Sequence, residues 1–78
     1  MPSYENKVLK RKVLDKELRL KVTQNEMSGR IFVEFSTENG KMVVQKSFQD
    51  NYEGQKEAEA FQKSMKNMRD FKKYLGIK

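Results

Sequence analysis

The sequence contains no cysteine and no histidine. Disulfide bridges, zinc sites built on thiolate or imidazole ligands, and catalytic dyads that need Cys or His are therefore excluded. No apolar run approaches the roughly 18 residues of a membrane-spanning helix. The basic residues near the N-terminus are followed by no apolar segment of the kind found in signal peptides. We therefore expect a cytoplasmic protein that binds no cofactor and no membrane.

Groups that could support catalysis are scarce as well. Acidic pairs such as Asp15 with Glu17 and Glu57 with Glu59 lie among charged neighbours, which would not raise the pKa of one member. Neither a Gly-rich phosphate loop nor a calcium-binding loop is present. The sequence predicts a protein that is not an enzyme.

Charge is abundant and unevenly distributed. The 78 residues are 36% charged with a net charge of +6, which suits one small domain. Residues 1–12 hold four cations and one anion, and residues 55–78 hold seven cations and three anions, whereas residues 13–54 hold six and seven. The excess at both ends favours an anionic partner. The alternative is that the lysines only keep a small domain in solution.

The middle of the chain shows the two-residue period of half-buried strands. Apolar residues alternate with polar ones over 18–23, over 31–36 and over about 41–48. Asn39-Gly40 between the second and third segments predicts a hairpin with a type I′ turn. Lys46 falls on the apolar face of the third strand, so it either extends past the sheet edge or follows a bulge.

A helical pattern follows the strands. Between Gly54 and Gly76 the chain has no Gly or Pro, and its apolar residues recur at helical spacing. This pattern predicts one long helix over about 55–75, ending at Gly76. The predicted core consists of Leu20, Ile31 or Val33, Phe35, Phe48, Phe61, Met65 and Met68.

These elements predict an α+β fold of the order β-β-β-α. A three-stranded antiparallel sheet would pack against one long C-terminal helix within a single domain over residues 13–78. Residues 1–12 are predicted to be a flexible or extended basic arm, with a short helix or an extra strand as the alternative. A core this thin suits a monomer or a weak homodimer.

The passage RIFVEFSTENGKMVVQKSFQDNYEGQKEAEAFQKSM contains a strand, a Gly-Lys turn, a strand ending in Ser-Phe and a helix opening with Glu-Ala. It resembles the arm-type N-terminal DNA-binding domain of phage and transposon tyrosine-recombinase integrases. In that family the three-stranded sheet inserts its exposed face into the major groove of DNA. The resemblance implies that role for Arg19, Lys21, Glu34, Val43 and Gln45.

Charge and resemblance together predict a small nucleic-acid-binding protein, DNA favoured, such as a phage or mobile-element accessory or regulatory factor. The cations expected to hold phosphates are Lys7, Lys10, Arg11, Lys12, Lys63, Lys66, Arg69 and Lys73. The residues expected to meet bases are Arg19, Lys21, Phe32 and Gln45.

The alternative is an adaptor or inhibitor that binds a larger protein through a sheet edge or through the face that carries Phe32 and Val43. That apolar pair could equally be a stacking platform for bases, or be covered by the N-terminal segment.

Overall fold

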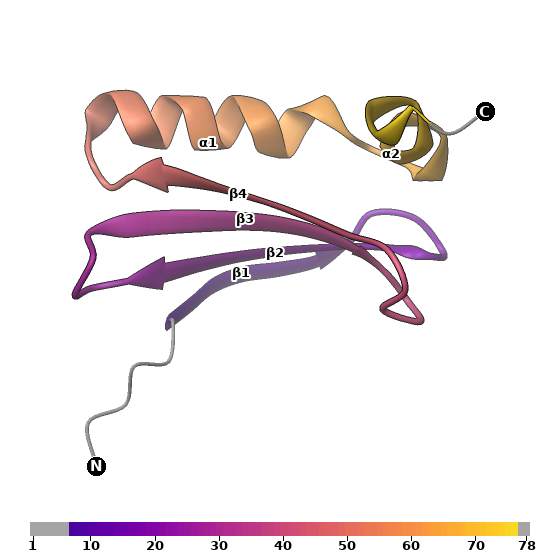
Figure 1. Ribbon diagram of the computed structural model, residues 1–78, viewed down its shortest axis with the longest axis horizontal. Helices are drawn as coiled ribbons and strands as arrows, with labels where there is room; N and C mark the ends of the chain where they lie inside the picture. The colour runs from indigo at the N-terminus through magenta and orange to yellow at the C-terminus, as the bar shows by residue number, and fades with distance from the viewer. Residues whose placement is uncertain (1–6, 77–78) are drawn as a thin grey trace, which may run out of the picture.

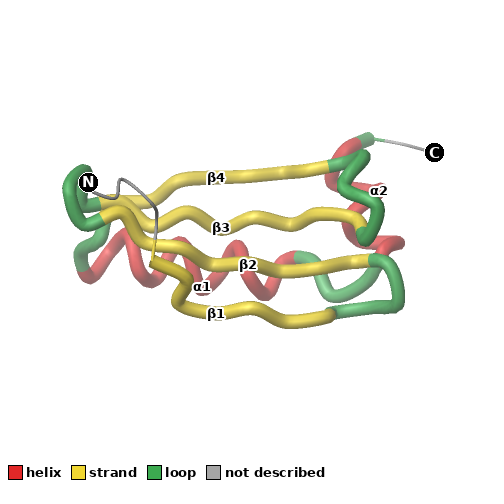
Figure 2. The backbone as a smooth tube through the Cα atoms, turned by 90° about the horizontal axis from the view of Figure 1, so that it is seen from below, coloured by secondary structure: helices red, strands yellow, loops and turns green. Residues whose placement is uncertain are grey.

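The computed structural model describes residues 7–76 and has an α+β architecture in two layers (Figure 1). The elements are β1 (Lys7–Val13), β2 (Leu18–Asn25), β3 (Arg30–Thr37), β4 (Val43–Gln49), α1 (Tyr52–Ser64) and α2 (Met68–Leu75). The strands form one antiparallel sheet in the order β1-β2-β3-β4. α1 packs on the face formed by β3 and β4, so the sheet has one helix-covered face and one outer face (Figure 2).

Three strands were predicted, and the sheet has four. β1 is the missing strand, and over residues 7–12, half of the segment predicted to be an arm, it pairs with β2. A shift of register between Val8 and Lys10 marks a β-bulge, which breaks the two-residue period. The bulge and the lysines on the helix-facing side of β1 hide the strand from a search for alternation. Residues 1–6 of the predicted arm lie outside the described residues.

One long helix was predicted, and there are two short ones. Met65 leaves the helical conformation with φ −130° and ψ 119°, and Asn67 caps a new helix. The Asn67 side chain accepts the Asp70 N–H, and the Asp70 carboxylate accepts the Lys66 N–H, both at 3.0 Å. This reciprocal capping satisfies N–H groups at the start of α2, so it competes with continuation of α1. The change of direction brings Phe71 into the core, fully buried.

The β3–β4 hairpin was predicted correctly, but its turn was not. Gly40 has φ 71° whereas Asn39 has a negative φ, so the type I′ turn, which needs positive φ at both positions, is wrong. The strands are joined by residues 38–42. The Gly40 N–H donates to the Thr37 carbonyl at 2.9 Å, and the Asn39 side chain accepts the Lys41 N–H at 3.0 Å. Local side-chain hydrogen bonds therefore shape this turn.

The core lies between α1 and the sheet. Every predicted core residue is buried except Met68, which is half-buried against the rest. The buried apolar residues are Leu18, Leu20, Val22, Ile31, Val33, Phe35, Phe48, Ala58, Phe61, Met65 and Phe71.

Lys46 sits on the core face of β4, in continuous register with β3, and remains exposed. Its Nζ lies 5.6 Å from the ring centroids of both Phe48 and Phe61. Of the two alternatives for Lys46, the structure therefore shows the extended side chain.

The start of α1 packs closely on the end of β4. Gly54 is buried, and a Cβ atom there would collide with the Gln49 carbonyl, so the contact requires glycine. Neither α1 nor α2, the helices of the described part of the chain, is long and apolar enough to cross a membrane.

Candidate nucleic-acid interface

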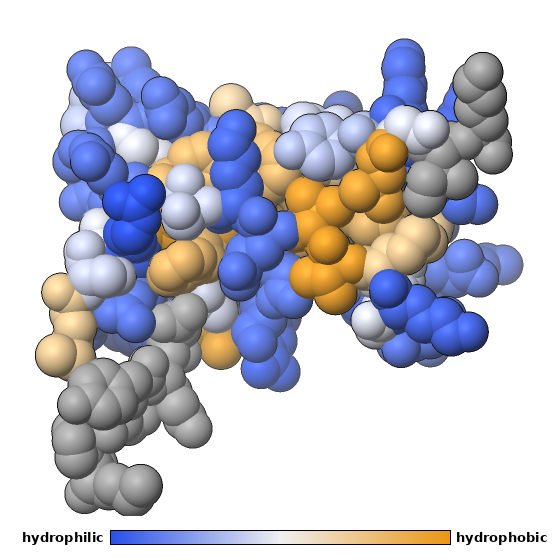
Figure 3. All heavy atoms as spheres, viewed as in Figure 1, coloured by the Kyte–Doolittle hydropathy of each residue, from blue (hydrophilic) through white to orange (hydrophobic). Residues whose placement is uncertain are grey.

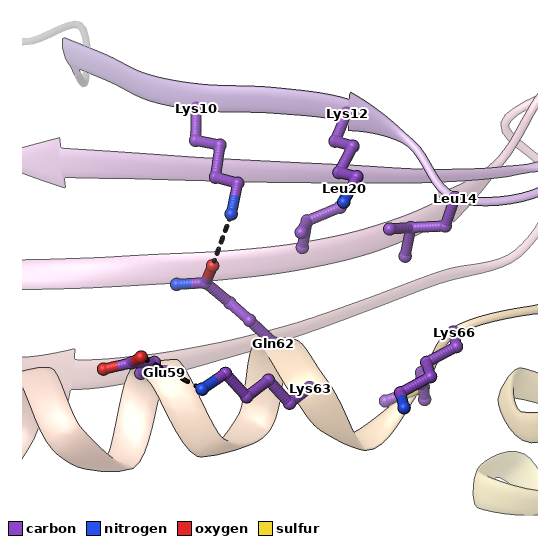
Figure 4. A pocket seen from close by; sticks show the side chains of 9 residues that line it. Lys10, Lys12, Leu14, Leu20, Glu59, Gln62, Lys63 and Lys66 are labelled. Carbon is purple, nitrogen blue, oxygen red and sulfur yellow. Dashed lines mark hydrogen bonds and ion pairs between the residues drawn. The ribbon is translucent and has the colours of Figure 1, made fainter.

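A groove runs between β1 and α1 on the helix-covered side of the sheet (Figure 4). It exists because α1 packs over β3 and β4 and leaves the inward side of β1 uncovered. Its volume is about 450 Å³, and its lining comes from both ends of the described chain. The lining residues are Lys10, Lys12, Leu14, Leu20, Glu59, Gln62, Lys63, Met65 and Lys66.

Four lysines make the groove cationic. Lys10 and Lys12 lie two residues apart on β1, so after the bulge they point to the same side of the strand. Lys63 occupies the last turn of α1, where the negative end of the helix dipole favours a cation, and Lys66 follows just beyond. The groove therefore unites cations that are more than 50 residues apart in sequence.

The two walls of the groove already touch. Lys10 Nζ donates to Gln62 Oε1 at 3.5 Å across the opening (Figure 4). On the helix wall, Lys63 pairs with Glu59 at 3.1 Å, and both side chains remain exposed. An exposed pair of this kind contributes little to stability, so Lys63 can exchange its partner at small cost.

A second hollow continues the groove toward the start of α1. It shares Lys10, Glu59 and Gln62 with the first, and it adds Leu9, Val22, Ile31, Gln55 and Ala58. Seven of the fourteen residues that line the two hollows are thus apolar, and Leu9 is the most exposed of the seven. The space-filling view shows the other side of the molecule, where β4 lies nearest the viewer; there hydrophilic side chains cross between the helical layer and the sheet, with apolar surface on either side (Figure 3).

The residues predicted to meet bases lie elsewhere, on the outer face of the sheet. Lys21, Glu34 and Gln45 form one cross-strand row there, in which the carboxylate separates the two potential DNA contacts. Arg19 pairs with Glu38 at 3.5 Å. Phe32 is half-buried. Arg11, from β1, lies beside Lys21 and joins this face rather than the groove.

Three predicted cations line neither surface. Lys7 begins β1, and Arg69 and Lys73 are exposed on α2. Only the four lysines of the lining were predicted as site residues, and Gln62 and Leu9 are among those that were not. Gln62 follows Glu59 by three residues, so helical spacing alone could have placed it on this wall. Leu9 gave no such signal, because its position depends on the bulge.

Within residues 7–76, no group of three or more Asp and Glu side chains is placed to hold a metal ion. No family model matches the chain, nor does any curated protein or solved structure. The resemblance to the integrase arm-binding domain therefore stays a prediction, carried by the residues of β3, β4 and α1 alone.

Proposed function

We propose that this protein binds nucleic acid through the groove between β1 and α1, as a DNA-binding accessory or regulatory factor. One observation carries the proposal: the fold brings Lys10 and Lys12 together with Lys63 and Lys66 around a single hollow. Surface lysines that serve only solubility have no need to converge. Four cations in a groove provide the phosphate contacts that supply most of the affinity in non-specific binding.

The outer face supports the proposal less well. Glu34 lies between Lys21 and Gln45, and Glu38 neutralises Arg19, so a phosphate backbone approaching this face meets anions as well as cations. Among residues 7–76, Glu59 alone contributes a carboxylate to the groove lining, and that carboxylate is already paired.

Neutralising the helix wall tests the proposal. In the double variant Lys63→Gln and Lys66→Gln, two phosphate contacts disappear, so affinity for a labelled oligonucleotide should fall at least about fivefold at about 100 mM salt. The slope of log K against log salt should become shallower by between about one and two. Fluorescence anisotropy at about 50 and 200 mM salt measures both quantities.

The matched control is the double variant Lys56→Gln and Lys72→Gln. It removes the same charge from exposed positions on α1 and α2 that do not line the groove. An equal loss in both double variants would show attraction by net charge alone and contradict the proposal. Failure of the wild type to bind either single or double strands at about 50 mM salt would favour the adaptor hypothesis. In that case Phe32→Ala, on the outer face, should abolish capture of the partner protein.

A further inference from the structure

The groove offers two kinds of surface to a ligand. Its walls are cationic, whereas its floor is apolar: Leu9 is 47% exposed there, and Leu20, Val22 and Ile31 reach the surface only at their edges, with 3%, 4% and 6% exposure. A single nucleic-acid strand has the complementary pair of surfaces, since its phosphates are charged and its unpaired bases expose apolar faces. A duplex keeps those base faces stacked inside and presents phosphates, so the apolar floor would gain no partner.

The width of the groove also distinguishes the two forms. Lys10 Nζ and Gln62 Oε1 are 3.5 Å apart, so side chains of the two walls meet across the opening. A DNA duplex is far too broad to enter this opening, since even the major groove on its surface measures about 12 Å across. One strand can enter once the exposed Lys10 side chain turns away from Gln62, because a single long hydrogen bond holds it there.

The length of the groove sets the size of the ligand. Along β1 and the residue that follows it, the lining runs from Leu9 to Leu14, which at about 3.3 Å per residue spans roughly 17 Å. Stacked nucleotides advance about 3.4 Å each, and an extended strand advances about twice as far. The groove therefore has room for about three to five nucleotides.

We infer that the groove binds a single nucleic-acid strand of this length in preference to a duplex, with phosphates on the four lysines and base faces against the apolar floor. The inference rests on the proposed function and specifies its ligand. DNA and RNA single strands share this chemistry, so both belong in the test.

The direct test compares single strands with a duplex. The probes are labelled thymine and uracil homopolymers of about 12 nucleotides and the duplex of the thymine strand with its adenine complement. At about 100 mM salt, one of the single strands should bind at least about tenfold more tightly than the duplex, with a salt slope near −3 for four contacts. Equal or tighter duplex binding would overturn this inference and leave the proposed function standing, whereas absence of all binding would overturn both.

A matched pair of variants tests the apolar floor. Leu9 and Val8 are neighbours on β1 with exposures of 47% and 40%, but only Leu9 lines the groove. Val8 pairs with Thr23 on the outer face. Leu9→Ser should lower single-strand affinity about three- to tenfold with an unchanged salt slope, while Val8→Ser should leave it unchanged. Thermal melts confirm that both variants fold. Equal effects of the two substitutions on affinity would show that the bases do not contact Leu9, and would contradict the inference.

Discussion

Phe61 holds the two layers together at the level of single residues. Its ring centroid lies 5.3 Å from that of Phe35 and 5.9 Å from those of Phe48 and Tyr74. The ring therefore contacts β3, β4 and α2 from its position on α1, and it is 8% exposed. Aromatic pairs at these separations stabilise beyond the burial of their area.

Replacement of the Phe61 ring should strongly destabilise the folded state. Phe61→Ala leaves a cavity between α1 and the sheet and should lower the free energy of unfolding by about 3–5 kcal/mol, enough to unfold a domain of this size. Tyr74→Ala is the control, because Tyr74 is 54% exposed and its loss should cost much less. Urea denaturation followed by circular dichroism measures both. Near-native stability of Phe61→Ala would show that the ring lies outside the core.

The elements differ in how well the sequence predicts them. Period-two alternation predicted β2 and β3, since each has one largely buried and one half-exposed face, and it also predicted β4, in which Phe48 alone is buried. β1 lacks a buried face, because its inward residues line a groove instead of the core. The break between α1 and α2 also escaped prediction, since the apolar stripe continues through Met65 and only the capping by Asn67 and Asp70 divides the helix.

The groove, like the elements, could be predicted only in part from the sequence. Charge counts alone pointed to its cations, because the excess lies at the two ends of the chain. The sides on which Lys12 and Arg11 lie could not be predicted, since the bulge at Leu9 sets which residues of β1 face inward.

One contact joins α2 to the first hairpin. Asp15, in the β1–β2 turn, accepts the Lys16 N–H at 2.7 Å and the Met68 N–H at 3.3 Å. These two backbone donors lower the pKa of Asp15 below its ordinary value of 3.8. The carboxylate thus caps a helix to which it is not joined in sequence, and its charge suits the positive end of the α2 dipole.

This contact makes part of the stability depend on pH. Because the pKa of Asp15 is lower in the folded chain than in the unfolded one, its contribution is complete above pH 3.8 and is lost as pH falls through the folded value. Asp15→Asn mimics the neutral acid, so its melting temperature should be lower than that of the wild type near pH 7. The difference should shrink below pH 3.8. A difference that stays constant from pH 7 to about pH 2 would contradict this role.

For the whole molecule, the proposed binding in the groove would be linked to folding. The walls of the groove lie 52 residues apart in sequence at the Lys10–Gln62 contact, so the unfolded chain has no equivalent site. A ligand that binds only the folded state stabilises it by about 2.7 kcal/mol at a hundred times its Kd.

The melting temperature should therefore rise with ligand concentration. For a domain of this size the expected increase at a hundred times Kd is on the order of 10 °C. The Lys63→Gln and Lys66→Gln double variant should require more oligonucleotide to reach the same increase. Differential scanning fluorimetry with the thymine homopolymer measures the shift. A wild-type melting temperature that does not change at saturation would contradict binding to the folded state.

The order of strands in the sheet also has a consequence for synthesis on the ribosome. Each of β2, β3 and β4 pairs with the strand made just before it, so hairpins can form as the chain emerges. The helix wall of the groove comes last. When all four strands have emerged from the ribosome but α1 has not, the nascent chain carries Lys10 and Lys12 without the helix that forms the opposite wall. On the proposal that the groove binds nucleic acid, tight engagement of the polyanion must therefore await the synthesis of α1, and a nascent chain without this helix should not capture it.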